Sequence, residues 1–246
     1  MNNVYVYDQE LSGRRYQKLL EQLETRLTDL GIGGKIYRLG PMTRLNDMAR
    51  EELSHHPKTL VAVGGDVLIS QLAGLVVGSN IPLGVIPIGK SMIGDAFGIN
   101  LENACRILAA RRIVNLDIGR VDDKYSFVCQ AVINANNPSL SLDAELMVSA
   151  EGEVRIEAVN VIGDEYGYRG AWPQADDGRL NVYILKTETG FLKKDISQSA
   201  FVCRKLSIKK GVTHVELDGG IVINGAKEIE IIPQMLSVIV SKERKF

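Results

Sequence analysis

The sequence predicts an α/β domain with a parallel sheet over residues 1–115, followed by an all-β sandwich domain over residues 116–246. Three observations predict this division. Two apolar runs, at residues 60–63 and 83–88, end abruptly in glycine, as buried parallel strands do where they enter a loop. Helical patterns with a period of about 3.6 alternate with such runs in the first half. Near residue 115 the period changes to about 2.

The first half alternates short apolar strands with amphipathic helices, which is typical of a parallel sheet covered on both faces. Leucines at helical spacing define the first helix, and Gly31 ends it. Thr43 is a candidate cap for the second helix, and Asn100 for the fourth. The expected order is strand 4–7, helix 16–30, strand 36–39, helix 43–53, strand 60–63, helix 67–77, strand 83–88 and helix 100–112.

The second half alternates apolar and polar residues between Gly, Asn and Asp turns, a pattern typical of antiparallel strands. No long helical pattern remains, so a sandwich or flattened barrel is expected. Its last strand is a candidate to pack back on the first domain, and the charged tail at residues 242–246 is expected to be solvated. Strands are expected at residues 114–118, 125–133, 144–149, 154–162, 180–185, 200–208, 212–217, 228–232 and 236–240.

Composition narrows the function classes. The net charge is −1, with 29 Lys and Arg against 30 Asp and Glu, so the sequence gives no electrostatic case for nucleic acid. The three cysteines (Cys105, Cys129 and Cys203) fit no metal-ligand spacing and are typical of a reducing compartment. No signal peptide or membrane span is visible, so a cytoplasmic protein is expected. Exposed strand edges leave a homodimer open.

A ligand site is expected where the two glycine-tipped strands end, because ligands of open α/β sheets bind beyond the carboxyl ends of the strands. Gly64 and Gly65 would let the backbone approach a bulky anion, and Asp66 beside them would act through a metal ion. Gly89 ends the neighbouring strand and is expected to meet them. The alternative is a tight strand-to-helix turn in which Asp66 caps the helix.

Six stretches, in chain order, resemble motifs of the diacylglycerol kinase and sphingosine kinase family of lipid kinases, within the NAD-kinase-like superfamily. In the first half they resemble the family's N-P-x-S-G, G-G-D-G-T and P-L-G-T-x-N-D segments. In the second half they resemble P-x-A-x-x-D-G-x-L, the D-G-E turn and the closing strands. The stretches are residues 11–13, 64–67, 82–89, 173–180, 215–219 and 231–240, so the resemblance covers nearly the whole chain.

This resemblance implies binding of ATP and Mg²⁺ and transfer of the γ-phosphate to a lipid hydroxyl. Asp66 and Asp218 would belong to the acidic network around the catalytic Mg²⁺, and Asp177 would ligate a separate structural cation. Asp177 has an alternative interpretation as an Asx turn before Gly178. The residues implied to hold the nucleotide are Ser12, Gly13, Gly64, Gly65, Asp66 and Gly89, with Thr43 in a looser alignment.

The chain departs from the family pattern at three places. Val67 and Leu68 replace the last glycine and the threonine of G-G-D-G-T, so a β-branched side chain stands at the position of closest approach to phosphate. Residues 90–95 form a rebuilt loop, in which Lys90 is either a phosphate counter-charge or a solvated lysine. Gly220 replaces the glutamate that serves the family as general base.

Two function classes stay open. The first is an ATP-dependent lipid kinase for diacylglycerol or a similar lipid, with weak or lost activity because the general base is missing. The second is a non-catalytic relative that binds a nucleotide, a lipid or a protein partner. An NAD kinase shares the G-G-D-G turn, but the segment at residues 173–180 belongs to the lipid kinase series and argues against that reading.

Overall fold

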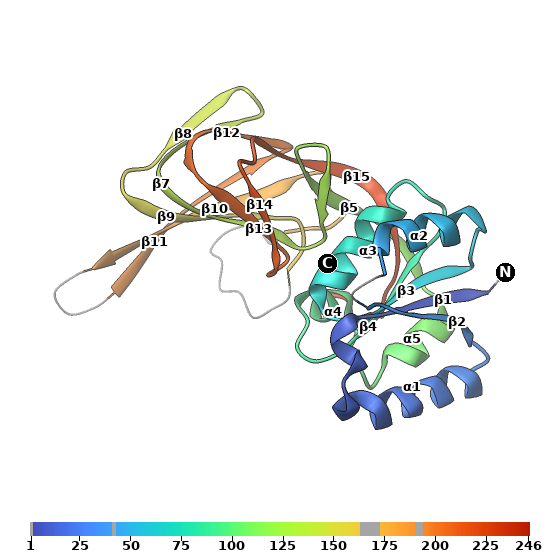
Figure 1. Cartoon of the computed structure of the whole chain (residues 1–246). Helices are drawn as coiled ribbons and strands as arrows, with labels where there is room; N and C mark the ends of the chain where they lie inside the picture. Colours follow the sequence, from blue (N-terminus) through green and yellow to red (C-terminus); the bar gives the residue numbers. More distant parts are fainter. Residues whose placement is uncertain (1, 41–42, 163–172, 190–193) are drawn as a thin grey trace. The chain divides into compact units, whose positions relative to one another are not determined.

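The structure, a computed structural model, describes residues 2–40, 43–162, 173–189 and 194–246 (Figure 1). The chain forms two compact units, Met1–Leu116 with Met235–Lys245, and Asp117–Gln234. The first is an α/β unit with parallel strands, and the second is an antiparallel all-β unit. The predicted fold class is therefore confirmed.

The first unit is a parallel sheet with helices on both faces. Its elements are β1 (Asn3–Tyr7), η1 (Gln9–Ser12), η2 (Arg14–Tyr16), α1 (Gln17–Asp29), β2 (Gly34–Arg38), α2 (Leu45–Ser54), β3 (Thr59–Gly64), α3 (Asp66–Val76), β4 (Leu83–Pro87), α4 (Met92–Phe97) and α5 (Ala104–Ala110). The strands lie in the order β4-β3-β1-β2, and the end of β15 (Glu228–Ile239) pairs with β4 at Val238 and Leu83. Helices α2 and α3 lie on one face of this sheet, and α1 and α5 on the other (Figure 1).

The central strands of this unit are apolar because they are buried on both faces of the sheet. Every residue of β3 and β4 is buried, as expected for parallel strands covered on both faces. In α1, the buried residues Leu20, Leu23 and Leu27 recur every three or four positions, so one stripe of the helix packs on the sheet. Among the described helices, none is long and apolar enough to cross a membrane.

The segment after β4 is helical, where a loop was expected at residues 90–95. Helix α4 begins after Ser91, whose hydroxyl oxygen accepts the N–H of Gly94 at 2.8 Å. It ends at Gly98, which has a left-handed φ of 68°. The cap and the terminating glycine enclose only 6 residues, too few to display a helical period in the sequence.

Helix α5 begins later than expected, because Asn103 and not Asn100 precedes its first residue. The side-chain oxygen of Asn100 accepts the N–H groups of Glu102 and Asn103, both at 3.0 Å. These bonds close a turn ahead of the helix. Asx turns and helix caps have the same local sequence preference, so sequence alone did not separate them.

The carboxyl-terminal tail was expected to be solvated, and Lys242 and Glu243 are exposed, but the backbone on either side of them is bonded to α4. The N–H of Ser241 donates to the carbonyl of Phe97, and the N–H of Lys245 to the carbonyl of Ala96, both at 3.0 Å. A Cβ atom on Gly98 would lie 2.9 Å from the backbone of Glu243, so the close approach of the tail requires glycine there. The tail therefore belongs to the first unit up to Lys245.

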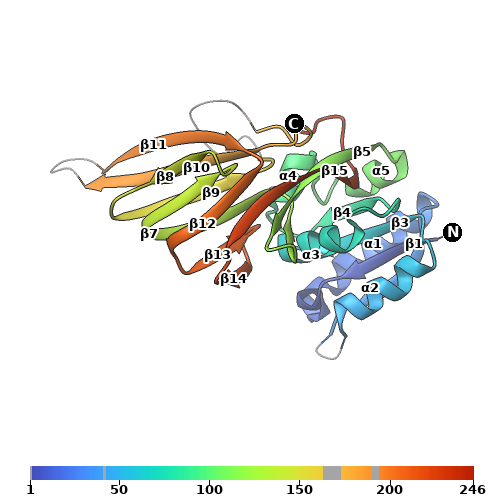
Figure 2. The same ribbon diagram turned by 90° about the horizontal axis from the view of Figure 1, so that it is seen from above.

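The second unit is built from antiparallel strands (Figure 2). Its elements are β5 (Ile113–Val121), which enters from the first unit, β6 (Tyr125–Phe127), β7 (Gln130–Leu142), β8 (Leu146–Ser149), β9 (Glu153–Val159), β10 (Leu180–Thr189), β11 (Lys194–Cys203), β12 (Lys205–Val212), β13 (His214–Leu217), β14 (Ile221–Asn224) and most of β15. The main order is β11-β10-β9-β7-β12-β15, and the β13–β14 hairpin pairs with β7. Side chains from these strands form one large apolar core.

Several strands differ from those expected, and the strand expected at residues 125–133 is divided between β6 and β7. The strand expected at residues 200–208 is broken at Arg204, where β11 ends and β12 begins. The strands expected at 228–232 and 236–240 are one strand, β15, and β14 was not predicted at all. The break at Arg204 has a long-range cause, because its N–H donates to the carboxylate of Asp143, 61 residues away in the sequence.

Three hairpins of the second unit have the same type of turn. Each passes through two residues with positive φ, as in a type I′ turn. The pairs are Asp122 and Asp123 (49° and 56°), Asp143 and Ala144 (51° and 60°), and Asp218 and Gly219 (44° and 73°). The closing bonds run from the N–H groups of Lys124, Glu145 and Gly220 to the carbonyls of Val121, Leu142 and Leu217. Aspartate is thus the first central residue in all three.

Replacing Ala144 with glycine is expected to stabilise the protein. Alanine at a φ of 60° is strained, and glycine removes that strain at some cost in unfolded-state entropy. We expect the free energy of unfolding to rise by about 0.5–1 kcal/mol in urea denaturation. The control is Ala200→Gly in strand β11, which should lower it by a similar amount. A loss of stability in Ala144→Gly would contradict the turn assignment.

The three cysteines are expected to resist thiol reagents in the native protein. Cys105, Cys129 and Cys203 are all buried, and none of the three forms a disulfide. Burial raises the pKa of the Cys203 thiol to about 12, so its reactive thiolate is scarce at neutral pH. Titration with a chromogenic disulfide should label all three thiols in denaturant and none quickly in its absence. Fast native labelling of any of them would show that its surroundings open readily.

Candidate functional site

The loops that follow the parallel strands of the first unit emerge at one edge of its sheet. Backbone hydrogen bonds join neighbouring loops there: Asp8 donates to Val63 at 2.9 Å, Leu39 to Tyr7 at 3.0 Å and Ile88 to Gly64 at 3.0 Å. The loops after β1, β3 and β4 carry most of the predicted nucleotide residues of this unit, and the loop after β2 carries Thr43. The structure therefore brings these segments to one edge, the carboxyl edge of the sheet.

The paired glycines after β3 have different surroundings. A Cβ atom on Gly64 would lie 2.6 Å from the Cβ atom of Asp8, so packing between β3 and the loop after β1 requires glycine. A Cβ atom on Gly65 would meet nothing within 4 Å, and Gly65 precedes the first residue of α3. Val67, two residues after Gly65, is 38% exposed. Gly65 therefore leaves open space where a side chain would otherwise stand, and the Val67 side chain is at the protein surface in the same turn.

Asp66 links the two glycine-tipped loops. Its carboxylate accepts the hydroxyl of Ser91, the N–H of Met92 at 2.7 Å and, more weakly, the N–H of Ile93 at 3.4 Å. Burial raises the pKa of Asp66 above its ordinary value, these hydrogen bonds oppose the shift, and the charge of Asp95 adds to it. The carboxylate thus holds the start of α4 and does not cap α3, its own helix.

The other predicted nucleotide residues of this unit lie in the same loops. Gly89 has a φ of 88°, which favours glycine, and a Cβ atom there would meet nothing within 4 Å. Lys90, Ser12 and Gly13 are exposed. Thr43 is also exposed, and helix α2 starts after Arg44 without a side-chain cap, so the predicted capping role of Thr43 was wrong.

Asp218 lies in the second unit, in the turn between β13 and β14. It is 2% exposed, and its carboxylate accepts the N–H groups of Val128 at 2.7 Å, Cys129 at 2.8 Å and Gln130 at 3.0 Å. Gly220, the position of the missing base, follows in the same turn and is exposed. The backbone of Asp218 and Gln130 is paired as well, because Asp218 donates its N–H to the Gln130 carbonyl at 3.0 Å.

Asp177, also in the second unit, forms a local turn. Its side chain is exposed, and Oδ1 accepts the N–H of Arg179 at 2.9 Å. Gly178 between them has a φ of 69°. This is the Asx-turn geometry that the sequence left as the alternative to a cation ligand.

Asp117 is a buried carboxylate that the sequence interpretation missed. It accepts the N–H of Gly178 at 2.6 Å and that of Gln234 at 2.9 Å, and it donates its own N–H to the Ala175 carbonyl at 2.7 Å. Burial raises the pKa of Asp117, and the N–H donors oppose that shift. The segment resembling P-x-A-x-x-D-G-x-L is therefore anchored by a residue about 60 positions earlier.

The sequence interpretation also missed Ser91. Ser91 and Asp117 each stand in a sequence pattern that indicates a structural role. Ser91 stands three positions before Gly94 and four before an acidic residue, which is typical of a helix N-cap. Asp117 is the one acidic residue in an otherwise apolar and alternating strand pattern, which favours a buried partner for its carboxylate. Neither signal identifies that partner.

The carboxylates of Asp66 and Asp218 do not fit a protein-held Mg²⁺ ion. Magnesium is bound through oxygen ligands at about 2.0–2.1 Å, in competition with hydrogen-bond donors. Both oxygens of Asp66 and both of Asp218 already accept N–H or O–H groups. Over the described part of the chain, no three His, Cys, Asp or Glu side chains are grouped so that they could hold a metal ion.

Comparison with known proteins finds similarity to lipid kinases. Residues 4–121 match the model of the diacylglycerol kinase catalytic domain. A probable lipid kinase YegS-like from Klebsiella pneumoniae (strain 342) is 35% identical over 86 residues, which are 33% of this chain and 29% of that relative. The matched stretch is thus less than a third of the relative's length.

Solved structures show the same fold. The crystal structure of a diacylglycerol kinase from Bacillus anthracis str. Sterne matches with a TM-score of 0.72 at 12% identity, over 99% of this chain and 98% of that one. Two more structures from the same organism match over the same shares, with TM-scores of 0.75 and 0.73 at 13% identity. At such low identity, these matches establish the fold.

Proposed function

Because residues 4–121 of this chain belong to the diacylglycerol kinase catalytic domain family, we propose that the protein is a lipid kinase-like enzyme. It binds ATP at the carboxyl edge of the first unit's sheet. It transfers the γ-phosphate to the hydroxyl of a lipid of the diacylglycerol type, at a low rate. The substrate class follows the family, and the low rate follows from the residues of this chain.

One observation of the structure supports the nucleotide site above all. Gly65 and Gly89 lie in loops joined by the Ile88–Gly64 hydrogen bond, and each leaves open space where a side chain would otherwise stand. A backbone without side chains at such an edge suits a bulky phosphate chain. In the proposal the phosphates lie against these two glycines, and Ser12 and Gly13 contact the nucleotide from the loop after β1.

The low rate follows from Gly220. In the transfer step, the bond between the γ-phosphorus and the bridging oxygen of ATP breaks, and a bond from the lipid hydroxyl oxygen to the phosphorus forms. The hydroxyl proton then needs an acceptor, and Gly220 offers no carboxylate. Phosphoryl transfer depends mostly on positioning and charge stabilisation, so a slow reaction survives the loss of a base.

The test is transfer of radiolabelled phosphate from ATP to mixed lipid vesicles, paired with a nucleotide titration. Nucleotide binding together with label in a lipid product supports the proposal. Absence of nucleotide binding would overturn the site at the carboxyl edge. The titration needs no lipid, so it tests the site separately from the choice of acceptor.

A second candidate function is nucleotide binding without transfer. It is favoured by Gly220 together with Val67, whose β-branched side chain is 38% exposed at the position of closest approach to phosphate. This candidate predicts a saturable nucleotide titration and no label in any lipid. The same paired experiment therefore separates the two candidates.

A further inference from the structure

We infer that Asp66 and Asp218 are positioning residues that hold backbone N–H groups of neighbouring segments, and that this chain holds no divalent cation through them. This rests on the proposed function, because the family resemblance assigns both aspartates to Mg²⁺. The inference reassigns each aspartate from metal binding to holding the backbone of its own unit.

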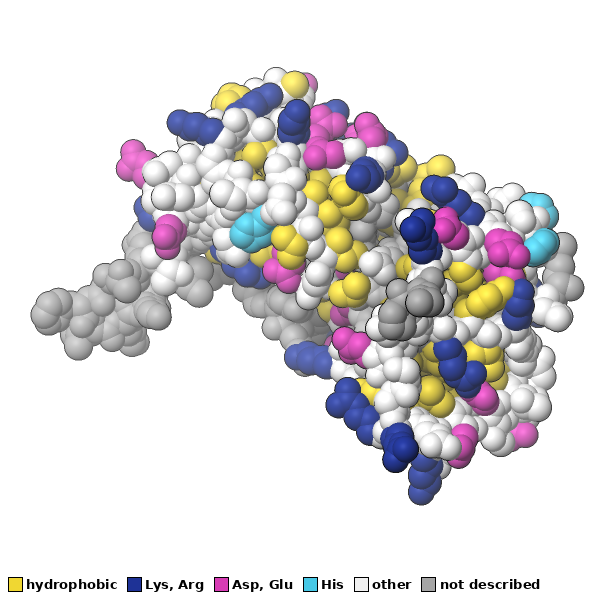
Figure 3. All heavy atoms as spheres, in the orientation of Figure 1, with side chains coloured by type: hydrophobic (Ala, Val, Ile, Leu, Met, Phe, Trp, Pro, Cys, Tyr) yellow, Lys and Arg dark blue, Asp and Glu magenta, His cyan; other side chains and the backbone are white. Residues whose placement is uncertain are grey.

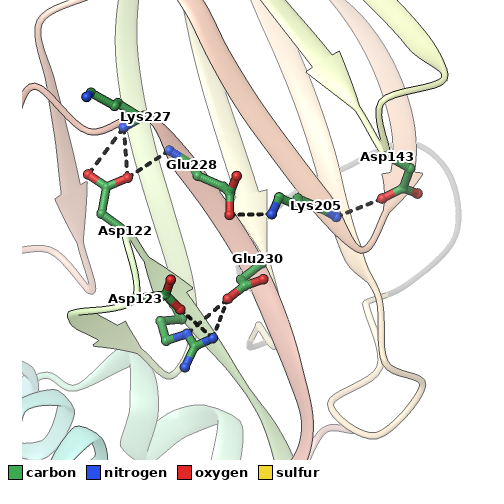
Figure 4. A network of polar contacts seen from close by, with 8 residues as sticks. Asp122, Asp123, Asp143, Lys205, Lys227, Glu228 and Glu230 are labelled. Carbon is green, nitrogen blue, oxygen red and sulfur yellow. Dashed lines mark hydrogen bonds and ion pairs between the residues drawn. The ribbon is translucent and has the colours of Figure 1, made fainter.

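Asp218 is one of three copies of the same structural device in the second unit. Asp122, Asp143 and Asp218 each take the first central position of a type I′ turn, with φ between 44° and 51°. Each carboxylate accepts two successive N–H groups from another segment, Lys227 and Glu228, Arg204 and Lys205, or Cys129 and Gln130. Figure 4 shows the copy at Asp122 and, at Asp143, the bond from Lys205.

The backbone bond is repeated as well. The N–H of each aspartate donates to the carbonyl of the second donor residue, which is Glu228, Lys205 or Gln130, at 2.9–3.1 Å. Side chain and backbone together clamp the turn onto the other segment. The same geometry occurs at three different places. It indicates that an aspartate in the turn is the unit's general means of fixing a hairpin to another segment, independent of any ligand site.

Asp122 and Asp143 are exposed, and Figure 3 shows that charged side chains of both signs are interspersed on the molecular surface. There, Lys205 pairs with Glu228 at 2.5 Å, and Arg120 with Glu230 at 2.5 Å. Neither Asp122 nor Asp143 needs a cation, because the N–H groups satisfy their oxygens. Asp218 differs from them in being buried and in accepting a third N–H, from Val128. Because the site is buried, leaving those N–H groups without an acceptor would cost more free energy than it would at the surface. A metal ion at Asp218 would have to compete with three N–H donors for the carboxylate.

Asp66 serves the first unit in the same way. Its oxygens accept from Ser91 and Met92, the cap and first residue of α4, and the Ser91 oxygen in turn accepts the N–H of Gly94. Asp66 therefore sets the position of the Gly89 loop relative to the loop after β3. Any Mg²⁺ that takes part would arrive bound to the nucleotide phosphates.

The test is a titration of Mn²⁺ alone, followed by electron paramagnetic resonance, on the full chain and on Asp66→Asn and Asp218→Asn. The matched control is Asp143→Asn, which alters the same device on the surface. We expect the same Mn²⁺ binding, or none, in all four proteins. A Mn²⁺ site present in the wild type and in Asp143→Asn but lost in either of the other variants would overturn the inference. If Asp218→Asn does not fold, comparing the wild type with Asp66→Asn still shows whether Asp66 binds Mn²⁺. In that case Asp218→Glu takes the place of Asp218→Asn as the variant that tests Asp218.

A second readout reports the positioning role directly. Amide hydrogen exchange at Met92 in Asp66→Asn should accelerate about tenfold or more, because a charged acceptor is lost. Unchanged exchange would contradict that role. The effect of Mg²⁺ on ATP affinity should be the same in the wild type and in Asp66→Asn, since a metal ion carried by the phosphates does not depend on this carboxylate. A Mg²⁺ advantage in the wild type that disappears in Asp66→Asn would overturn the inference. If no ATP binds with or without Mg²⁺, the proposed function fails, and the Mn²⁺ titration still decides the inference.

Discussion

Replacing Gly220 with glutamate is expected to raise the rate of phosphate transfer to lipid by about 10²–10⁴-fold. That is the usual contribution of a positioned general base, and the substitution restores the carboxylate of the family's D-G-E turn. The backbone permits it, because Gly220 is exposed and is not among the residues with positive φ. The measurement is the initial rate of radiolabel transfer from ATP to diacylglycerol vesicles.

Two variants control for this result. Gly220→Gln has the same shape without a base, so it should show no gain. Gly219→Glu places the charge one residue earlier, at a φ of 73°, where a side chain is strained and differently directed. If Gly220→Glu gains nothing, even combined with Val67→Gly, the proposed acceptor chemistry at this turn is wrong.

Asp218→Ala is expected to lower the free energy of unfolding by about 3–5 kcal/mol. The substitution leaves the N–H groups of Val128, Cys129 and Gln130 buried without their charged acceptor. It also places alanine at a φ of 44°, which adds a smaller strain. Urea denaturation of the purified chain, with the midpoint and slope fitted together, measures the loss.

Asp143→Ala is the matched control for this loss. It carries the same backbone strain, at a φ of 51°, and removes the same device, but its partners are at the surface. We expect a loss of about 1–2 kcal/mol, because water replaces the lost acceptor. Equal losses in the two variants would mean that burial at Asp218 contributes little, against the positioning role argued for it.

The sequence predicted which residues make up much of the candidate site, but it did not predict the contacts that those residues make. The glycine-tipped strands were visible because a buried parallel strand is a continuous apolar run that ends where its loop begins. Gly64 was predicted to approach a ligand, whereas its packing against Asp8 already requires glycine. Asp218 was found through its D-G turn, but its partners lie up to 90 residues away in the sequence. No local pattern encodes such a pairing.

The sequence by itself determined the order and type of the elements, the division into an α/β half and an all-β half, and the family resemblance. These depend on hydrophobic period and on turn residues, which act over a few neighbouring positions. Only the tertiary structure decided what Asp66, Asp117 and Asp218 bind, because their carboxylates are satisfied by N–H and O–H groups that folding brings from distant segments. The physical reason is that a buried carboxylate requires partners, and which partners it meets depends on the packing of the whole unit.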